Sequence, residues 1–228
     1  MIEEPTKTPG DILAKSFAQL RQQIDALTPE IRAERKRHAD EIAQRQRQTA
    51  ITQLLNESKA PERQRQNRNL DRSGPWAVTE QKILSKLGSG FFIGLIGTRG
   101  GGKTQLGVEA IRRCSRDLKR SRFCTATEFF IEIKSSYNSE ENSEKNVLDR
   151  FTKPQLLVID EVGQRSESEW ENRLLFELLN RRYNAIKDTL LISNQTVESF
   201  CQSLGPSLVS RMQETGGLIE CKWPSYRK

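Results

Sequence analysis

A glycine-rich octapeptide is the part of this sequence whose residue types and spacing point most directly to chemistry. It fits the pattern GxxxxGK[ST] and consists of Gly97, Thr98, Arg99, Gly100, Gly101, Gly102, Lys103 and Thr104. The glycines allow backbone N–H groups to converge on phosphate oxygens without a Cβ in the way. Lys103 is placed to reach the β- and γ-phosphates of a nucleotide, and Thr104 to hold Mg²⁺ through its hydroxyl. The octapeptide therefore predicts a binding loop for ATP and Mg²⁺, but not the use of the bound nucleotide.

Two carboxylates follow a second apolar run further along the chain. Residues 156–159 are Leu-Leu-Val-Ile, typical of a buried strand, and Asp160 and Glu161 come directly after them. In open parallel sheets, ligands bind beyond the carboxyl ends of the strands. We therefore expect Asp160 to hold Mg²⁺ and its waters, and Glu161 to orient or activate an attacking water. The alternative is a solvated strand end with two chance acids, but the loop and the acids follow the order that a P-loop ATPase needs.

A polar residue and an arginine complete the predicted site. Asn194 follows the apolar run 190–193 and could bond the γ-phosphate or the attacking water. Arg211 comes later, on a predicted short helix, where it could act on the nucleotide of a neighbouring subunit as an arginine finger. An ordinary surface arginine is an open alternative, because only the position of Arg211 in the chain supports the first interpretation. A finger that acts in this way would require the protein to self-associate.

Short apolar runs alternate with helical patterns around these residues and would position them. Strands that alternate with helices predict a parallel sheet with helices on both faces, an α/β fold. The phosphate loop would then join the first strand to the helix that follows, as its motif requires. The expected strands are 91–96, 122–126, 155–160, 189–194 and 217–223. The expected helices are 79–87, 103–119, 127–137, 168–185 and 196–213, the last broken at Gly205-Pro206.

A helical N-terminal segment, residues 1–56, precedes this core. Its apolar residues from Leu13 to Ile31 recur at alternating spacings of four and three, which predicts a single helical stripe. Thr28 can cap a new helix and Pro29 suits its first position, so we expect two helices or one that bends there. The stripe is far from the core in sequence, which favours an interaction helix over packing on the chain's own core.

Polar residues dominate between this stripe and the core. From 32 to 48 the predicted helix is polar on almost every side, as in a helix that is exposed or awaits a partner. Residues 57–78 are polar and arginine-rich, with a composition typical of a linker. The core itself is expected to span residues 79–228.

Composition indicates which partners and which cellular location to expect. The formal net charge of +7 favours a polyanionic partner such as nucleic acid, although a well-solvated surface would also explain it. We expect no membrane association, because no apolar run is long enough to span a bilayer and no signal-peptide pattern opens the chain. A cytoplasmic location with free thiols is expected, because the cysteines form no CxxC pair and His38 is the only histidine. The cysteines are Cys114, Cys124, Cys201 and Cys221.

The order of these features resembles an AAA+ ATPase, and more closely a DnaC-type replicative helicase loader, a family that is also similar to the IstB transposition ATPase. The resemblance is carried by Gln155 to Gly163 (QLLVIDEVG), by Ser210-Arg211-Met212 and by the ending Trp223-Pro224-Ser225-Tyr226-Arg227. It covers roughly residues 60–228. The fold that it implies is an AAA+ P-loop core with a five-stranded parallel sheet and no C-terminal lid.

The resemblance also assigns roles to single residues. It makes Gly97 to Thr104 the Walker A motif, and Asp160 and Glu161 the Walker B motif. Asn194 becomes sensor 1, and Arg211 the arginine finger.

The same family binds single-stranded DNA through helices next to the second strand. In this chain the corresponding residues are Phe130, Lys134 and Tyr137, whose spacing places them on one helical face. An aromatic face with a lysine suits base stacking and backbone contact. For the neighbouring Phe129, packing on the sheet is the preferred interpretation.

The function implied is ATP-dependent loading of a hexameric, DnaB-type replicative helicase onto single-stranded DNA, with the N-terminal helices gripping the helicase. Two alternatives remain open. One is an IstB-like transposition helper ATPase, which would prefer duplex DNA. The other is a nucleotide-switched, helicase-binding protein without productive ATPase activity, although Glu161 argues against an inactive site.

Overall fold

The computed structural model describes residues 15–21, 29–66, 74–137 and 143–226. The chain divides into two units, Met1–Thr49 and Ala50–Lys228, which are described separately below. Among the described residues, none of the helices combines the length and the apolar character that a membrane crossing requires.

The described part of the N-terminal unit is helical. Residues 15–21 form one short helix, and α2 (Pro29–Glu57) begins at the proline that the sequence predicts as a helix start. Every residue from 31 to 49 is exposed, and Phe17 remains 64% exposed. Leu13, Ile24, Leu27 and Thr28, which belong to the predicted stripe and its break, lie outside the described residues. The exposed surface of this unit agrees with a helix that does not bury its apolar side chains within the chain.

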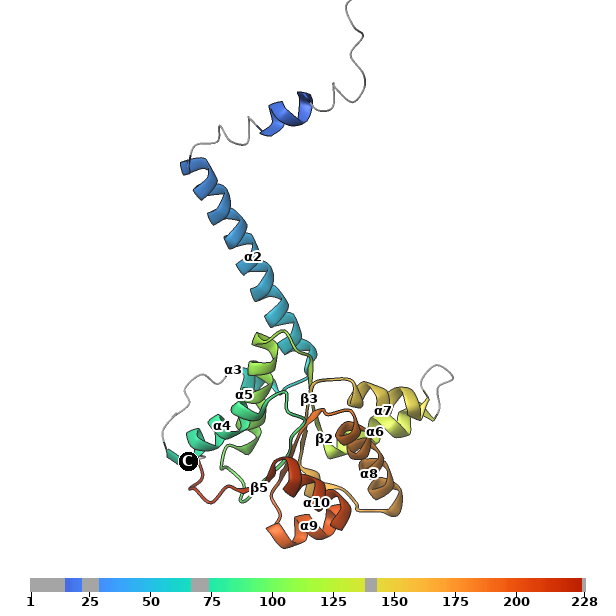
Figure 1. The fold of residues 1–228 in the computed structure, drawn as a ribbon. Helices are drawn as coiled ribbons and strands as arrows, with labels where there is room; N and C mark the ends of the chain where they lie inside the picture. The colour runs from blue at the N-terminus through green and yellow to red at the C-terminus, as the bar shows by residue number, and fades with distance from the viewer. Residues whose placement is uncertain (1–14, 22–28, 67–73, 138–142, 227–228) are drawn as a thin grey trace, which may run out of the picture. The chain divides into compact units, whose positions relative to one another are not determined.

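Five strands of the second unit form one parallel sheet, as predicted (Figure 1). Their order is β2-β3-β4-β1-β5, so β1 lies between β4 and β5 and the edge strands are β2 and β5. The carboxyl ends of β1, β3 and β4 therefore meet at one edge of the sheet, where the loops that follow them converge. The strands are β1 (Phe92–Ile96), β2 (Ser121–Thr125), β3 (Leu156–Asp160), β4 (Asp188–Ser193) and β5 (Gly217–Glu220).

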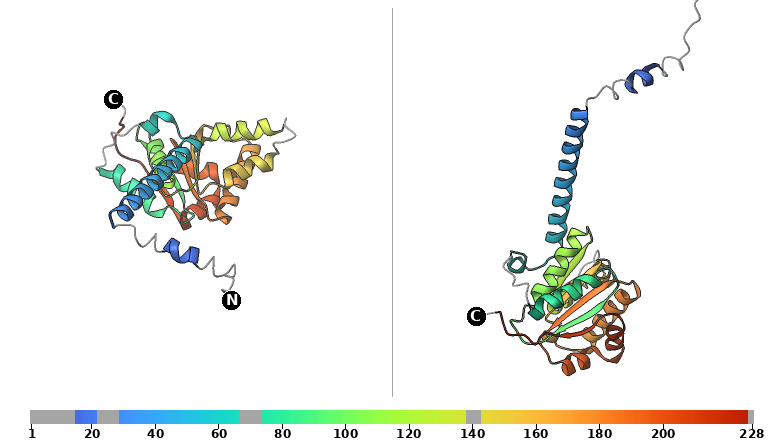
Figure 2. Two further views of the ribbon diagram at one scale, coloured as in Figure 1. Left: turned by 90° about the horizontal axis from the view of Figure 1, so that it is seen from above. Right: turned by 60° about the vertical axis from the view of Figure 1, so that its left-hand side comes forward.

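Helices cover both faces of the sheet, and each face has its own apolar core (Figure 2). Successive residues of β3 alternate between the two cores: Leu157 packs with one group of helices and Val158 with the other. One face is covered by α4 (Gly74–Lys86) and α5 (Lys103–Arg116). The other is covered by α6 (Ala126–Ser136), α7 (Glu144–Thr152), α8 (Glu169–Asn184), α9 (Val197–Leu204) and α10 (Pro206–Thr215).

Residues 57–78, which were expected to be a linker, contribute to the core instead. They contain α3 (Glu62–Gln66) and the first turn of α4, and the side chains of Ala60 and Trp76 are buried. The predicted start of the next helix at Thr79 is also wrong. Pro75 occupies the first turn after Gly74, and the Thr79 hydroxyl donates to the Pro75 carbonyl at 2.9 Å inside α4. The helix therefore begins at Gly74-Pro75 and not at the predicted cap, Thr79.

The helix α7 was not predicted, because its sequence is mostly polar. Ser143 caps it by accepting a hydrogen bond from the Asn146 N–H at 3.3 Å. Val147, Leu148 and Phe151 are buried on one side of this nine-residue helix. Three buried apolar residues are enough to hold this short helix in place because α7 packs between α6 and α8.

A buried arginine fixes the amino ends of β3 and β4. Arg182 is 0% exposed, and its guanidinium donates to the carbonyls of Phe151 (2.9 Å) and Pro154 (3.0 Å) and to the Thr189 hydroxyl (2.9 Å). Burial lowers the pKa of Arg182 to about 9, and the nearby Asp188 opposes part of that change. These contacts satisfy carbonyls that no backbone ladder reaches, so Arg182 holds the end of the sheet opposite to the phosphate loop.

Candidate nucleotide-binding site

A cleft of about 530 Å³ lies where the loops after β1, β3 and β4 converge. It brings together most of the residues that the sequence predicts for the site, from the phosphate loop, from the acidic end of β3 and from the end of β4. The predicted residues that line it are Arg99, Gly100, Gly101, Gly102, Lys103, Thr104, Asp160, Glu161 and Asn194. The other lining residues, which the sequence analysis does not assign to the site, are Arg63, Gln64, Gln105, Gln164, Ile192 and Tyr226.

The backbone of the phosphate loop has the form that an anion site needs. Gly102 precedes α5 in the left-handed conformation (φ 73°), and no side chain caps this end of the helix. The N–H groups of the first turn are thus directed at the cleft together with the positive end of the helix dipole. Gly97 has φ 140°, and a Cβ there would lie 2.6 Å from the Cys221 carbonyl oxygen. Both glycines are therefore required by the shape of the loop.

Lys103 connects the loop to the end of β4. Its side chain is buried, and Nζ donates to the Gly97 carbonyl (2.7 Å), the Thr98 carbonyl (2.8 Å) and Asn194 Oδ1 (2.8 Å). Lys103 and Asn194, which the sequence assigns to the site separately, are thus in direct contact. Phosphate oxygens are stronger acceptors for an ammonium than these neutral groups, so a γ-phosphate can exchange with them.

The acidic end of β3 lies against the first turn of α5. The Thr104 hydroxyl donates to Asp160 Oδ2 at 2.6 Å, and the Glu161 N–H donates to Asp160 Oδ1 at 2.7 Å. Burial raises the pKa of Asp160, while the hydrogen bonds from Thr104 and Glu161 and the charge of Lys103 lower it in part. A hydroxyl and a carboxylate oxygen this close together are the hard ligands that Mg²⁺ prefers, so these two residues fit the ion.

Glu161 occupies an uncommon backbone conformation. Its φ is 56°, in the left-handed region, immediately before a short 3₁₀ turn (Val162–Gln164). Left-handed backbone at a non-glycine residue costs free energy and is concentrated at functional sites. The side chain lines the cleft, and Gln164 Nε2 donates to its Oε1 at 3.4 Å. The Glu161 side chain thus lies in the cleft together with Asp160.

Arg211 lies away from this cleft. Its guanidinium donates to Asn180 Oδ1 at 2.5 Å and lies 4.9 Å from the centroid of the Tyr183 ring. Both partners belong to α8, which packs against α10. Arg211 is not among the residues that line the cleft of its own chain.

The predicted DNA-binding face is only partly available. Phe130 is 3% exposed and packs against Phe129 and Trp170, so it cannot stack on a base, and this part of the prediction is wrong. Helical spacing shows which residues share a face of a helix but not what packs on that face. Here Trp170 of α8 covers the face at Phe130. Lys134 Nζ lies 5.1 Å from the Trp170 ring, whereas Tyr137 is 55% exposed and donates its hydroxyl proton to Glu144. Phe129 is buried, as expected.

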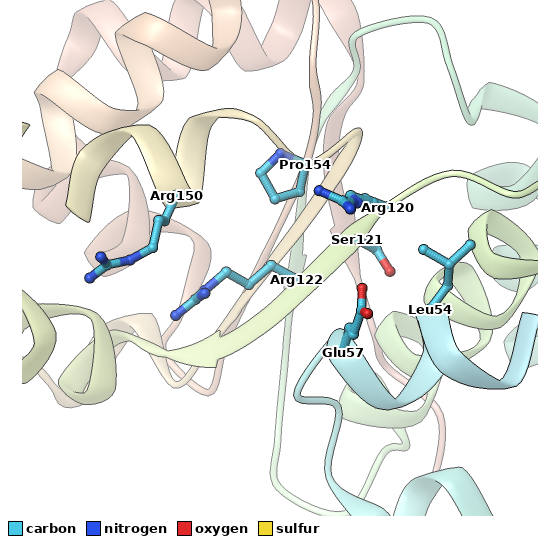
Figure 3. A pocket seen from close by; sticks show the side chains of 7 residues that line it. All are labelled: Leu54, Glu57, Arg120, Ser121, Arg122, Arg150 and Pro154. Carbon is cyan, nitrogen blue, oxygen red and sulfur yellow. The ribbon is translucent and has the colours of Figure 1, made fainter. Parts of the chain in front are cut away.

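A second, smaller pocket of about 190 Å³ lies at the amino end of β2 and contains several arginines (Figure 3). Arg122 and Arg150 both pair with Glu132, at 2.5 and 3.0 Å, and the Arg122 guanidinium lies 4.0 Å from the Phe151 ring centroid. These contacts hold α6 and α7 on the edge strand, so the pocket belongs to the packing of the fold. It is lined by Leu54, Glu57, Arg120, Ser121, Arg122, Arg150 and Pro154.

Comparison with known proteins identifies the family. The sequence profile of the IstB-like ATP binding proteins matches residues 11–228. The chain belongs to the family of IstB-like ATP-binding proteins. The replicative helicase loader DnaC of Escherichia coli is 28% identical over 135 residues, which are 58% of this chain and 54% of DnaC. The chain thus spans about half the length of the DnaC relatives that it matches. The uncharacterized protein YdaV of Escherichia coli is 25% identical over 203 residues, 86% of this chain and 82% of YdaV.

Solved structures agree on the fold. The crystal structure of the DnaC helicase loader superposes with a TM-score of 0.59 at 22% identity and covers 70% of this chain and 99% of that one. The AMPPCP-bound DnaA from Aquifex aeolicus has a TM-score of 0.56 at 22% identity, over 65% of this chain and 47% of DnaA. These structures share the fold of this chain, so the predicted α/β core with a five-stranded parallel sheet between helices is confirmed.

Proposed function

We propose that this IstB-like protein is an ATP-dependent loader that places a hexameric, DnaB-type replicative helicase on single-stranded DNA. The observation that carries the proposal is the cleft in which Lys103 meets Asn194 and Thr104 meets Asp160. An AAA+ cleft of this form supports nucleotide turnover, and the similarity to DnaC supports helicase loading as its purpose. The proposal therefore has two parts, ATP hydrolysis and helicase loading, that can be tested separately.

In the hydrolytic step, the phosphate loop binds the phosphates through its N–H groups and Lys103 offsets their charge. Mg²⁺, held by Thr104 and Asp160, would supply further positive charge at the β- and γ-phosphates. Glu161 accepts a proton from the attacking water, whose oxygen forms the new bond to the γ-phosphorus. The bond from this phosphorus to the β–γ bridging oxygen breaks, which gives ADP and inorganic phosphate. Asn194 orients the water or the γ-phosphate.

Self-association is part of the proposal, because Arg211 does not line the cleft of its own chain. In an assembly of AAA+ cores, Arg211 would reach the nucleotide of the neighbouring copy and stabilise the charge that develops on the transferred phosphoryl group. This step would require Arg211 to leave Asn180, its hydrogen-bond partner on α8.

The other contacts proposed are with the helicase and with DNA. In the N-terminal unit, Phe17 and Leu20 are 64% and 55% exposed, and side chains of this kind suit a protein partner such as the helicase. On the core, Lys134 and the exposed Tyr137 remain candidates for contact with single-stranded DNA.

A loading assay tests the proposal with the intact protein. With ATP and its cognate helicase, the protein is expected to form a complex and to place the helicase on a closed-circular single strand coated with single-strand-binding protein. The matched control is Lys103→Ala, which should still bind the helicase through the N-terminal unit but should not hydrolyse ATP. The loader hypothesis fails if the intact protein forms no complex with its cognate helicase.

A transposition helper is the second candidate function, favoured by the family profile that covers residues 11–228. Such a protein would bind duplex DNA in preference to single strands. Titrating both forms of one sequence with the protein and ATP distinguishes the two functions, because a loader should bind the single strand more tightly.

A further inference from the structure

The phosphate loop is held from outside through three consecutive carbonyl groups. The Gly100 carbonyl accepts from the Tyr226 N–H at 3.0 Å, and the Gly101 carbonyl from Trp223 Nε1 at 2.7 Å. The Gly102 carbonyl accepts from Trp76 Nε1 at 3.2 Å, in addition to the helical bond from the Leu106 N–H. Two indoles and one main-chain amide, from segments at opposite ends of the core sequence, thus converge on the outer side of the loop.

These bonds determine where the amides of the loop point. In a planar trans peptide, the carbonyl of one residue and the N–H of the next point in opposite directions. If the carbonyls of residues 100–102 are held on the outer side, the N–H groups of residues 101–103 face the cleft. Glycine peptides rotate easily because they lack a Cβ, so a run of three glycines does not hold this orientation by itself. The N–H donors of Tyr226, Trp223 and Trp76 therefore hold a peptide orientation that the loop sequence alone does not fix.

The donors themselves are firmly placed. Trp76 is 3% exposed in the first turn of α4, and Trp223 packs against the same apolar core. The Cys221 N–H donates to the Ile96 carbonyl at 2.6 Å, which aligns the C-terminal segment with the end of β1. A Cβ on Gly102 would lie 3.6 Å from Cδ2 of Tyr226, so this segment also reaches the loop beside Trp76. A Cβ on Gly102 would lie 2.8 Å from Trp76 Nε1, so this glycine also makes room for the indole.

We propose that Trp76 and Trp223 are positioning residues of the nucleotide site, whose indole N–H groups hold the phosphate loop with its amides toward the phosphates. The inference deepens the proposed function and rests on its nucleotide-binding step. Because binding energies are coupled reciprocally, a bound nucleotide also tightens the attachment of residues 223–226 to the loop.

Replacing each indole by a phenyl ring tests the positioning role. Trp223→Phe and Trp76→Phe keep an aromatic ring but remove the N–H donor, and Trp170→Phe is the matched control outside the loop. Loss of one neutral hydrogen bond predicts that the Kd for ATP rises about 3- to 10-fold in each loop variant. The KM for ATP should rise by the same factor while kcat stays within about twofold, because the donors act before the chemical step. Unchanged Kd and KM values in both loop variants would overturn the inference.

A second measurement avoids replacing either donor. In the full chain carrying Trp170→Phe, only Trp76 and Trp223 remain as tryptophans. Trp76 is already buried, so a decrease in acrylamide quenching on adding ATP reports protection of Trp223. Such a decrease is expected, and quenching that ATP leaves unchanged contradicts the coupling. If the wild-type chain itself fails to bind ATP, the proposed function fails, whereas binding that is insensitive to both substitutions rejects only the positioning role.

Discussion

Asp160 should carry a stability cost that its function requires, and Asp160→Asn is the substitution that reveals it. The carboxylate is 7% exposed, and burial raises its pKa despite the hydrogen bonds from Thr104 and Glu161. Asparagine has nearly the same shape, keeps an acceptor for the Glu161 N–H and removes the buried charge. Substitutions that relieve a cost of this kind commonly stabilise a protein by about 0.5–2 kcal/mol. For a unit of this size, each kcal/mol raises the Tm by about 2–4 °C.

The pH dependence gives the sign of the effect. A buried acid with a raised pKa binds a proton more tightly in the folded than in the unfolded chain, so it destabilises the fold most when the pH lies above both pKa values. At pH values well above the ordinary carboxyl range, we expect Asp160→Asn to have the higher Tm without nucleotide. As the pH falls toward the ordinary carboxyl range, the wild-type carboxyl takes up its proton and the difference between the two Tm values should shrink.

Adding ATP and Mg²⁺ should reverse the order of the two proteins. A ligand present at 100 times its Kd stabilises the fold by about 2.7 kcal/mol, and only the wild type keeps the carboxylate that fits Mg²⁺. Thermal unfolding by circular dichroism from pH 4 to 8, with and without the ligands, measures each of these differences. Lower stability of Asp160→Asn at pH 7, or a difference that grows toward pH 4, would refute the explanation by burial.

Three further predictions concern hydrolysis and the fold. Glu161→Gln should bind ATP normally but hydrolyse it about 10²- to 10⁴-fold more slowly, because it removes the proposed base; an unchanged turnover in a phosphate-release assay excludes that role. Arg211→Ala should bind ATP normally but lose activity, and mixing it with Glu161→Gln should restore part of the turnover, since each chain then supplies what the other lacks. Failure of the mixture to recover argues against an arginine finger acting between copies. Arg182→Met should lower the free energy of unfolding by about 3–5 kcal/mol, measured by urea denaturation, because several buried carbonyls lose their donor. A loss below about 1 kcal/mol would show that water replaces the guanidinium.

The local parts of the site were predictable from the sequence. The phosphate loop follows an apolar strand and opens α5, and the two acids follow β3, so each motif is defined by residues that are adjacent in the chain. The five strands and most of the helices around them were also predictable, since their apolar patterns are strong, whereas the mostly polar α7 was missed. Domain boundaries were harder, because the polar residues around Ala60 hide a segment that packs into the core.

Contacts between distant residues could not be predicted in this way. Trp223 lies 122 residues from the carbonyl that it binds, and nothing in its neighbourhood signals a link to the phosphate loop. A contact between distant residues also explains the error at Phe130. Periodicity places Phe130 on one helical face with Lys134, but it does not show that Trp170 covers this face. In both cases an indole from a remote segment determines the outcome.

The two halves of the proposed catalytic site differ in how they are supported. The groups proposed to bind phosphate belong to one chain and are held by its own contacts, since Lys103 bonds Asn194 and the loop carbonyls bond the indoles. In the part of the chain that the structure describes, the Arg211 guanidinium contacts side chains of α8 and lies outside the cleft. Reaching the nucleotide of a neighbour would break its bond to Asn180, a charged hydrogen bond worth about 1.5–3 kcal/mol. That cost is recovered only when a neighbour presents a phosphate that attracts the guanidinium more strongly. Binding of ATP is therefore expected of the single chain, whereas rapid hydrolysis is expected only of an assembly whose clefts are filled.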